Sequence, residues 1–423
     1  MVLVSCQKEA DSVSVDKASW KVAYTGGEYT IAVTANGEFT AAADQSWVTT
    51  TVGEGKVDFV AAENEGTEAR TATITVTCGE ATATAVVEQA GAPNYVSLGK
   101  AANSFIVSAA GYYYFDGTVM GNGDAGLHSS FPITSTKLDP KGAKLVWQEV
   151  DGLISNVELK DGNVRFEVAS KDGNAVIAVT DASDNVLWSW HIWSAEEPND
   201  VTVGNWVAMD RNLGATATSG TEAKGLYYQW GRKDPFSMTI AFDSGAGEGW
   251  YHPVVGGGED ASNAEIHSIA YSIAHPESFI AATDNAVKDW IAEPGTQNWR
   301  WGLNFAVDGM LDFQLLKTIF DPCPYGYAVA SDAFYRAGWE TKEIGTDATT
   351  LFDGKLTFVN STFVYNGGYG WWEDSNKAAC MWSCSTAWGN TSNAFRLSAV
   401  EGDPSGNYDP ACAHAVRCVK FGE

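Results

Sequence analysis

The sequence predicts a mainly β protein with few helices. Glycine is abundant at 43 residues, and aromatic residues make up 12% of the chain. Thr, Val and Ala alternate over long stretches, which is typical of sandwiches and of turn-rich β-structure. Long runs with helical periodicity are nearly absent. At 423 residues the chain exceeds one ordinary domain, so two to four domains of roughly 100–200 residues each are expected.

The net charge excludes one class of partner. Lys and Arg number 26 against 53 Asp and Glu, which gives a formal net charge of −27. Phosphate backbones and anionic membrane surfaces repel such a chain, so no nucleic-acid partner is expected. The sequence also has no apolar run of about 18 residues, the length that would predict a membrane-spanning helix.

Residues 1–10, "MVLVSCQKEA", contain a candidate lipid anchor. The fragment "LVSC" looks like a bacterial lipobox, in which the cysteine, here Cys6, is diacylated and becomes the mature N-terminus. Only five residues precede Cys6, so the basic and apolar parts of a signal peptide are expected upstream of them. With Cys6 lipidated, the protein is expected at the outer membrane, on the cell surface.

Residues 11–91 are expected to form an immunoglobulin-like β-sandwich. Turns such as "TGGE", "ANGE" and "ENEGTE" separate the strands. Trp20 and Trp47 are interpreted as core residues because large aromatics dominate small β cores, with stacking on sugar as the alternative. Strands are expected at 12–16, 28–34, 46–51, 56–61, 70–78 and 81–89.

A resemblance to a known family supports this first domain. The stretch "ASWKVAYTGGEYTIAVTANGEFTAAADQSWVTT" and the closing "EARTATITVTCGEATATAVVEQAGA" resemble the BACON module of Bacteroidetes surface proteins. The resemblance implies a domain that either binds carbohydrate or acts as a spacer.

Residues 95–200 are expected to form a second β-sandwich or meander domain. Its stretch "AVIAV" at 175–179 is apolar on both faces and predicts a central strand. In "VLWSWHIW", the alternation of a strand puts Trp188 and Trp190 on the core face, whereas His191 and Trp193 look to the other face.

The rest of the chain, residues 201–423, carries a second resemblance. The stretches "MDRNLGAT" and "GLYYQWGRKDPF" resemble fimbrillin-family surface lipoproteins, and "TIFDPCPYGYAV" with "CMWSCSTAWGNTSNAFRLSA" is similar to the Fibrobacter major paralogous domain. The resemblance implies a C-type-lectin-like α+β fold. Two short helices are also expected, "NAVKDWIAE" after Thr283 and Asp284 and "AFYRAGWE" after Ser331 and Asp332, because these residues are good N-caps.

Cysteines cluster near the C-terminus. Such clustering in an exported protein predicts one or two disulfides with one thiol left over. The pairing stays open, with Cys323, Cys418, Cys384 and Cys412 as candidates, and Cys380 as the fifth member of the cluster. No paired C-x-x-C spacing accompanies them, which disfavours zinc.

No catalytic motif emerges from the sequence. The six histidines are scattered, and neither H-E-x-x-H, nor G-x-S-x-G, nor a P-loop is present. The protein is therefore expected to be no enzyme and to need no metal or cofactor. A hydrolase of surface glycans is the alternative, and it would require two carboxylates facing each other across a cleft.

The strongest candidate site is "NGGYGWWEDSN", at 366–376. Its tryptophan rings could stack on sugar C–H surfaces, and the neighbouring polar groups could bind hydroxyls. Adjacent residues of a strand point to opposite sides, so at most one tryptophan would be buried, and the alternative is that both cap the core. The candidate ligand-binding residues are Trp371, Trp372, Glu373, Asp374 and Asn376.

A second candidate, in "GLYYQWGRKDPF", offers Tyr227 and Trp230 as ligand-binding residues, although a framework role is favoured for them. Together these features predict a non-enzymatic, lipid-anchored surface protein for adhesion or glycan binding, with a glycan or another surface ligand, and possible fimbrial subunits, as its partners. A structural pilus subunit or anchor without ligand, polymerising by strand donation, is the alternative.

Overall fold

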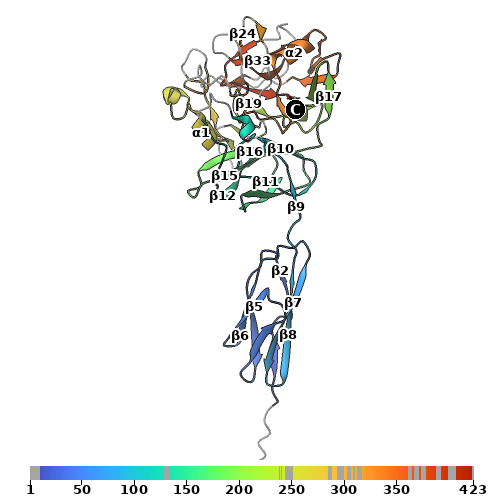
Figure 1. Cartoon of the computed structure of the whole chain (residues 1–423), viewed down its shortest axis with the longest axis vertical. Helices are drawn as coiled ribbons and strands as arrows, with labels where there is room; N and C mark the ends of the chain where they lie inside the picture. The colour runs from blue at the N-terminus through green and yellow to red at the C-terminus, as the bar shows by residue number, and fades with distance from the viewer. Residues whose placement is uncertain are drawn as a thin grey trace, which may run out of the picture. The chain divides into compact units, whose positions relative to one another are not determined.

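The computed structural model describes residues 10–127, 133–237, 239, 241–242, 251–283, 288–292, 300–302, 306–307, 310–311, 317–360, 364–365, 371–372, 378–386, 392–398 and 406–421. The described chain is mainly β, with several four-stranded sheets and two short α-helices (Figure 1). It divides into two compact units, residues 1–94 and 95–423.

Unit 1 is a sandwich of two four-stranded sheets. One sheet has the order β1 (Val13–Val15), β3 (Gly27–Ala35), β6 (Lys56–Ala61), β5 (Val48–Gly53). The other has the order β2 (Ser19–Val22), β8 (Ala81–Gln89), β7 (Arg70–Cys78), β4 (Thr40–Ala43). Along β7 every second residue is buried, from Ala72 to Cys78, so this strand has one face in the core.

The six strands expected in unit 1 are confirmed, and two further strands join them. The additional strands are β2, "SWKV", and β4, "TAAA". β4 is mostly alanine, which has little strand preference, and β2 has only four residues, so neither segment carries a strong pattern. Their pairing comes instead from long-range neighbours, since β2 runs parallel to β8 and β4 runs antiparallel to β7.

Unit 2 begins with a second sandwich. One sheet has the order β10 (Ser104–Val107), β16 (Val186–Ser194), β15 (Gly173–Thr180), β12 (Gly142–Gln148). The other has the order β13 (Ile154–Lys160), β14 (Asn163–Val168), β11 (Gly111–Asp116), β9 (Tyr95–Ser97). β15 lies between β16 and β12 with all its residues buried, which confirms the central strand expected at 175–179.

The tryptophans of β16 are buried, as expected. Trp188 and Trp190 are fully buried, and the Trp190 ring lies 4.9 Å from that of Phe115 in the opposite sheet. The other face of β16 is buried too. There, Ser189 Oγ donates to Asp234 Oδ1 at 2.6 Å, and Trp193 Nε1 donates to the Ala215 carbonyl at 3.1 Å.

The boundary expected near residue 200 lies within a single compact unit of the structure. Residues from 102 to 418 contribute to one hydrophobic core, and residues 95–423 form a single compact unit. The physical reason is that β16 needs cover on both faces. The segment after residue 210 supplies the second cover.

The remainder of unit 2 brings the end of the chain back against its middle. One sheet has the order β17 (Asp200–Val203), β18 (Trp206–Met209), β36 (Cys418–Lys420), β26 (Tyr327–Val329). A five-stranded sheet has the order β19 (Tyr227–Gln229), β35 (Ala413–Val416), β32 (Ala378–Thr386), β33 (Ser392–Ser398), β34 (Gly406–Tyr408). A third sheet comprises β27 (Glu343–Ile344), β28 (Ala348–Leu351) and β29 (Leu356–Val359).

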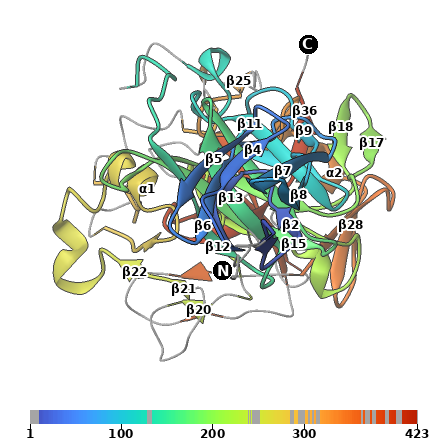
Figure 2. The ribbon, with the colours of Figure 1, turned by 90° about the horizontal axis from the view of Figure 1, so that it is seen from below.

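Short elements complete the description of unit 2. The paired two-residue strands are β20 (Ala241–Phe242) with β21 (Tyr251–His252), β22 (Val254–Val255) with β23 (Phe279–Ile280), β24 (Ala306–Val307) with β25 (Met310–Leu311), and β30 (Val364–Tyr365) with β31 (Trp371–Trp372). The 3-10 turns are η1 (Asp124–Gly126), η2 (Thr221–Ala223) and η3 (Gly258–Ser262). Figure 2 shows α1 (Ile269–Ala274) on the opposite side of unit 2 from β28.

One of the two expected helices is confirmed. α2 (Asp332–Trp339) begins after Ser331, whose side chain accepts a hydrogen bond from the Phe334 N–H. α1, capped by Ser268, was not expected.

The prediction of a helix after Thr283 and Asp284 is wrong for residues 288–292, which are not helical. The Asp289 carboxylate forms a buried ion pair with Arg300, and Trp290 Nε1 donates to the Trp230 carbonyl at 2.8 Å. These tertiary contacts override the local capping pattern. Residues 284–287 and 293 of the expected helix lie outside the described residues.

One of the expected disulfides is present. Cys323 and Cys418 are bonded, 95 residues apart in sequence. Cys384 and Cys412 are free thiols, so the prediction that they are disulfide partners is wrong. Burial raises the pKa of Cys384 to about 12 and that of Cys412 well above its usual range. Both therefore stay protonated, and a protonated thiol does not attack a disulfide.

Removing the disulfide should destabilise unit 2. In a Cys323→Ser, Cys418→Ser variant, the unfolded chain regains the freedom that a loop of about 100 residues loses on cross-linking, so the free energy of unfolding should fall by about 2–5 kcal/mol. Urea titration followed by tryptophan fluorescence measures this. Cys384→Ser is the matched control and should change little. An unchanged transition in the double variant would contradict the prediction.

Candidate functional site

The strongest sequence-predicted site lies partly within the described residues. Trp371 and Trp372 form β31, which pairs antiparallel with β30 in the register Val364↔Trp372 and Tyr365↔Trp371. The two tryptophans therefore have extended backbone. Their partners in the candidate site, Glu373, Asp374 and Asn376, lie outside the described residues. The site as a whole stays a prediction.

The second candidate pair lies in the core. Trp230 is fully buried, and its Nε1 donates to the Ser383 carbonyl at 3.0 Å. Tyr227 is only 3% exposed and sits in β19, paired with β35. The Arg300 guanidinium also lies 4.6 Å from the centre of the Trp230 ring. Neither ring is open to a ligand from solution, which favours the framework role.

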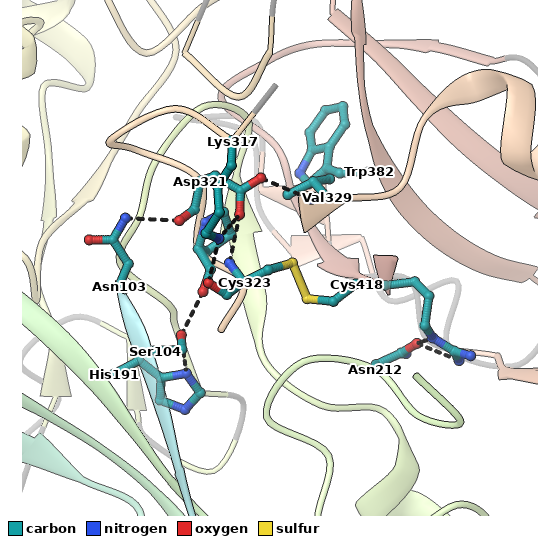
Figure 3. The surroundings of a disulfide bond; sticks show 12 residues. Asn103, Ser104, His191, Asn212, Lys317, Asp321, Cys323, Val329, Trp382 and Cys418 are labelled. Carbon is teal, nitrogen blue, oxygen red and sulfur yellow. Dashed lines mark hydrogen bonds and ion pairs between the residues drawn. A yellow bond between two sulfur atoms is a disulfide. The ribbon is translucent and has the colours of Figure 1, made fainter. Parts of the chain in front are cut away.

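A buried polar cluster surrounds the disulfide (Figure 3). Asn103 Nδ2 donates to the Ile319 and Asp321 carbonyls at 2.7 and 2.8 Å. Lys317 Nζ donates to Asp321 Oδ1 at 2.8 Å and to the Cys323 carbonyl at 2.7 Å. The Asp321 carboxylate also accepts from the backbone N–H groups of Cys323 and Val329. Because these charges are matched within the protein, the cluster holds segments together and offers no open ligand position.

A second buried cluster contains a serine, a histidine and a glutamate. Ser237 Oγ donates to the Glu149 carboxylate, and Asn174 Nδ2 donates to the same carboxylate at 2.6 Å. His252 Nε2 accepts from the Ser237 backbone N–H at 3.1 Å, rather than from its hydroxyl. In a nucleophilic triad the histidine accepts the hydroxyl proton. This cluster does not have that arrangement.

Burial shifts the pKa of several groups beside these clusters. Loss of hydration raises the pKa of Glu149, although bonds from Ser237 and Asn174 oppose the rise. It lowers the pKa of His191 to about 3 and that of His252 to about 4. Within the described residues, no group of three or more His, Cys, Asp and Glu side chains could hold a metal ion.

The tryptophans of unit 1 are covered by cations. Lys17 Nζ lies 4.3 Å from the centre of the Trp20 ring, and the Arg70 guanidinium lies 4.4 Å from that of Trp47. Both rings also pack against the sandwich core. Arg70 is held in place by Gln89 Oε1 and by the Ala62 and Glu63 carbonyls. This favours the core interpretation of both tryptophans over sugar stacking.

One hollow in unit 2 was missed by sequence reasoning. It measures about 480 Å³ and lies between residues 219–224 and residues 346–360. The two walls are more than 100 residues apart in the chain, and neither carries a recognisable motif. No local pattern could have brought them together.

The described part of the chain has no helix that is both long and apolar enough to cross a membrane. Residues 37–90 match the BACON family model, whose description reads "Putative binding domain, N-terminal". This confirms the BACON resemblance for that part of unit 1. Among curated proteins, none matches the chain.

Solved structures align with limited parts of the chain. A Bacteroides ovatus GH5 xyloglucanase in complex with a XXXG heptasaccharide shares 24% identity over 23% of this chain and 22% of its own, with a TM-score of 0.18. A protein from Bacteroides thetaiotaomicron shares 19% identity over 22% of this chain and 98% of its own, with a TM-score of 0.18.

A fragment of three immunoglobulin domains from titin shares 12% identity over 48% of this chain and 76% of its own, with a TM-score of 0.20. Similarities at these scores carry no conclusion about function. The chain spans less than a quarter of the xyloglucanase.

The buried histidines predict a loss of stability in acid. An unfolded histidine has a pKa near 6.5. In the folded protein, burial lowers the pKa of His191 to about 3 and that of His252 to about 4, so both stay neutral well below pH 6.5. As the pH falls below about 6.5, the unfolded chain binds protons that the folded chain does not, so the free energy of unfolding decreases, by up to about 1.4 kcal/mol per pH unit for each histidine. The raised pKa of Glu149 acts in the opposite direction.

Urea unfolding at pH 7.5 and 5 measures this effect. A His191→Gln variant keeps a group that can bond to Ser104 and Asn174 but cannot titrate, so its stability should depend less on pH. His275→Gln, at a half-exposed histidine, should retain the wild-type dependence. Equal pH dependence in the two variants would count against the assignment.

Proposed function

We propose that this protein is a non-enzymatic surface protein for adhesion or glycan binding, anchored through a lipid on Cys6 to the outer membrane. Unit 1 acts as a spacer, and unit 2 carries the ligand site within a C-type-lectin-like region that begins near residue 201. Residues 37–90 match a family described as a binding domain, but cations lie over the rings of Trp20 and Trp47 in that unit, so we assign the ligand site to unit 2. A glycan is the first ligand class to test, because tryptophan rings can stack on the C–H surfaces of sugars.

The observation that carries the proposal is the strand pair β30 and β31. It gives Trp371 and Trp372 an extended backbone, next in sequence to Glu373 and Asp374. The described core of unit 2 is already filled by other tryptophans, namely Trp147, Trp188, Trp190, Trp193, Trp230, Trp290, Trp301 and Trp382. A sugar ring stacked on tryptophan and bonded through hydroxyls would bind weakly, and several copies on one surface would strengthen adhesion.

Substituting the tryptophans should weaken glycan binding. On a glycan array, the intact chain should bind at least one glycan, and Trp371→Ala or Trp372→Ala should reduce that signal because a stacking surface is lost. Tyr325→Ala is the matched control, since Tyr325 is an aromatic residue 54% exposed elsewhere in unit 2. An intact chain that binds no glycan would contradict the proposed function.

The spacer role of unit 1 has its own test. Residues 95–423, produced alone, should bind the same glycans as the intact chain with the same affinity, because they form a separate compact unit and the rings of Trp20 and Trp47 are covered. Biolayer interferometry of both proteins on one immobilised glycan measures this. A large loss of affinity in the shorter protein would assign binding to unit 1.

A further inference from the structure

The hollow of unit 2 is lined by groups that donate and accept hydrogen bonds. One wall is the loop that contains η2, and the other is the hairpin of β28 and β29 together with its flanking turn. Lys224 supplies an ammonium group and Asp347 a carboxylate. Hydroxyl groups come from Ser219, Thr221, Thr346 and Thr357.

One buried acceptor at this hollow has no partner. Asn360 is 4% exposed and lines the hollow, yet its Oδ1 has no hydrogen bond. Its backbone N–H donates to the Asp347 carbonyl at 2.8 Å, and its Nδ2 donates to the Thr346 carbonyl at 2.9 Å. Because a carbonyl can only accept, the side-chain nitrogen must face Thr346. The oxygen is left to accept from a group that the chain does not supply.

A single buried guanidinium holds both walls. Arg417 Nη2 donates to the Thr357 carbonyl on β29 at 2.8 Å and to Asn212 Oδ1 at 2.8 Å. Asn212 Nδ2 in turn donates to the Lys224 carbonyl of the other wall at 3.0 Å. Asn212 lies near Cys418 of the disulfide in Figure 3. These hydrogen bonds hold the two walls in place in the absence of a ligand. Such preorganisation lowers the entropic cost of binding.

The lining selects a neutral ligand rich in hydroxyl groups. A hydroxyl both donates and accepts, so it can satisfy Asn360 Oδ1 and the Lys224 ammonium together. An anion would face Asp347, and a cation would face Lys224. The volume of about 480 Å³ falls within the range of small-molecule sites. No aromatic residue is among those that line the hollow, so hydrogen bonds rather than stacking dominate there.

We propose that this hollow binds one neutral saccharide unit, with Asn360 Oδ1 accepting a ligand hydroxyl and Lys224 donating to a ligand oxygen. The ligand class rests on the proposed function, whereas the place rests on the hollow and on Asn360. Asn360 lies four residues before Val364, which pairs with Trp372, so the two Cα atoms are at most about 14 Å apart. The pair of β30 and β31 therefore begins within the reach of a short glycan chain bound at Asn360.

The test uses the full chain and single sugar units. Isothermal titration with methyl glycosides of glucose, galactose and mannose should give a millimolar dissociation constant for at least one of them, and glucuronate should bind more weakly. Ala348 lines the hollow, so the larger side chain of an Ala348→Trp variant should fill it and abolish this binding. Lys224→Met should weaken it by about 2- to 10-fold, the effect of one hydrogen bond. Lys355→Met, in the exposed turn between β28 and β29, is the control and should bind like the wild type.

Several results would overturn this inference. The inference fails if the protein binds no neutral glycoside, or if it binds glucuronate more tightly than the neutral glycosides. It also fails if a folded Ala348→Trp variant binds like the wild type. Thermal melting shows whether Ala348→Trp folds, and Asn360→Ala gives a second variant if it does not. If Trp371→Ala abolishes array binding while the hollow variants bind normally, the hollow inference fails and the proposed function stands. If single sugars bind in the hollow but neither Trp371→Ala nor Trp372→Ala changes the signal on the glycan array, the tryptophan site fails instead.

Discussion

Unit 2 depends on one strand that is buried on both faces. In β16, all residues from Trp188 to Ser194 are buried. One face fills the sandwich, where Trp190 meets Phe115. The other face carries polar groups, and each of them needs a partner because water cannot reach it. Ser189 Oγ donates to Asp234 Oδ1 at 2.6 Å, and Trp193 Nε1 donates to the Ala215 carbonyl at 3.1 Å. A segment beyond residue 210 must therefore dock on β16. For this reason the sandwich and the C-terminal sheets form one unit.

Local patterns predicted what depends on neighbours along the chain. The alternation in "VLWSWHIW" identified the core face of β16, and the doubly apolar "AVIAV" identified the central strand. The same alternation could not reveal what covers the opposite face, because its partners come from another part of the chain. The helix expected around residues 288–292 was wrong for a related reason, since the ion pair between Asp289 and Arg300 fixes that segment in another conformation. Among the candidate cysteines, spacing could not select Cys323 with Cys418, because the pairing follows from β26 lying beside β36.

Some candidate binding residues carry a local sequence signal, whereas others come together only through contacts between distant parts of the chain. Trp371 and Trp372 were found from the sequence because a glycine-rich turn and adjacent tryptophans form a local signal. The hollow beside Asn360 has no such signal, since Arg417 joins its walls from a third place in the chain. Tyr227 and Trp230, the second candidate pair, lie in the core, in line with the framework role that the sequence favours for them. The sequence alone therefore does not separate an aromatic cluster of the core from one at a ligand site. The polar group that the fold leaves unmatched at the hollow is a signal that only the structure gives.

The interior of unit 2 also bears on the pilus alternative. Strand donation requires a sheet edge that a partner strand can reach. β10 is at the edge of its sheet, but Asn103 and Ser104 bind the carbonyls of Ile319, Asp321 and Pro322. This segment continues into Cys323, which the disulfide ties to the C-terminal strand β36. A donor strand that displaced this segment would leave the buried side chains of Asn103 and Ser104 without these partners. That cost disfavours strand donation at the start of β10.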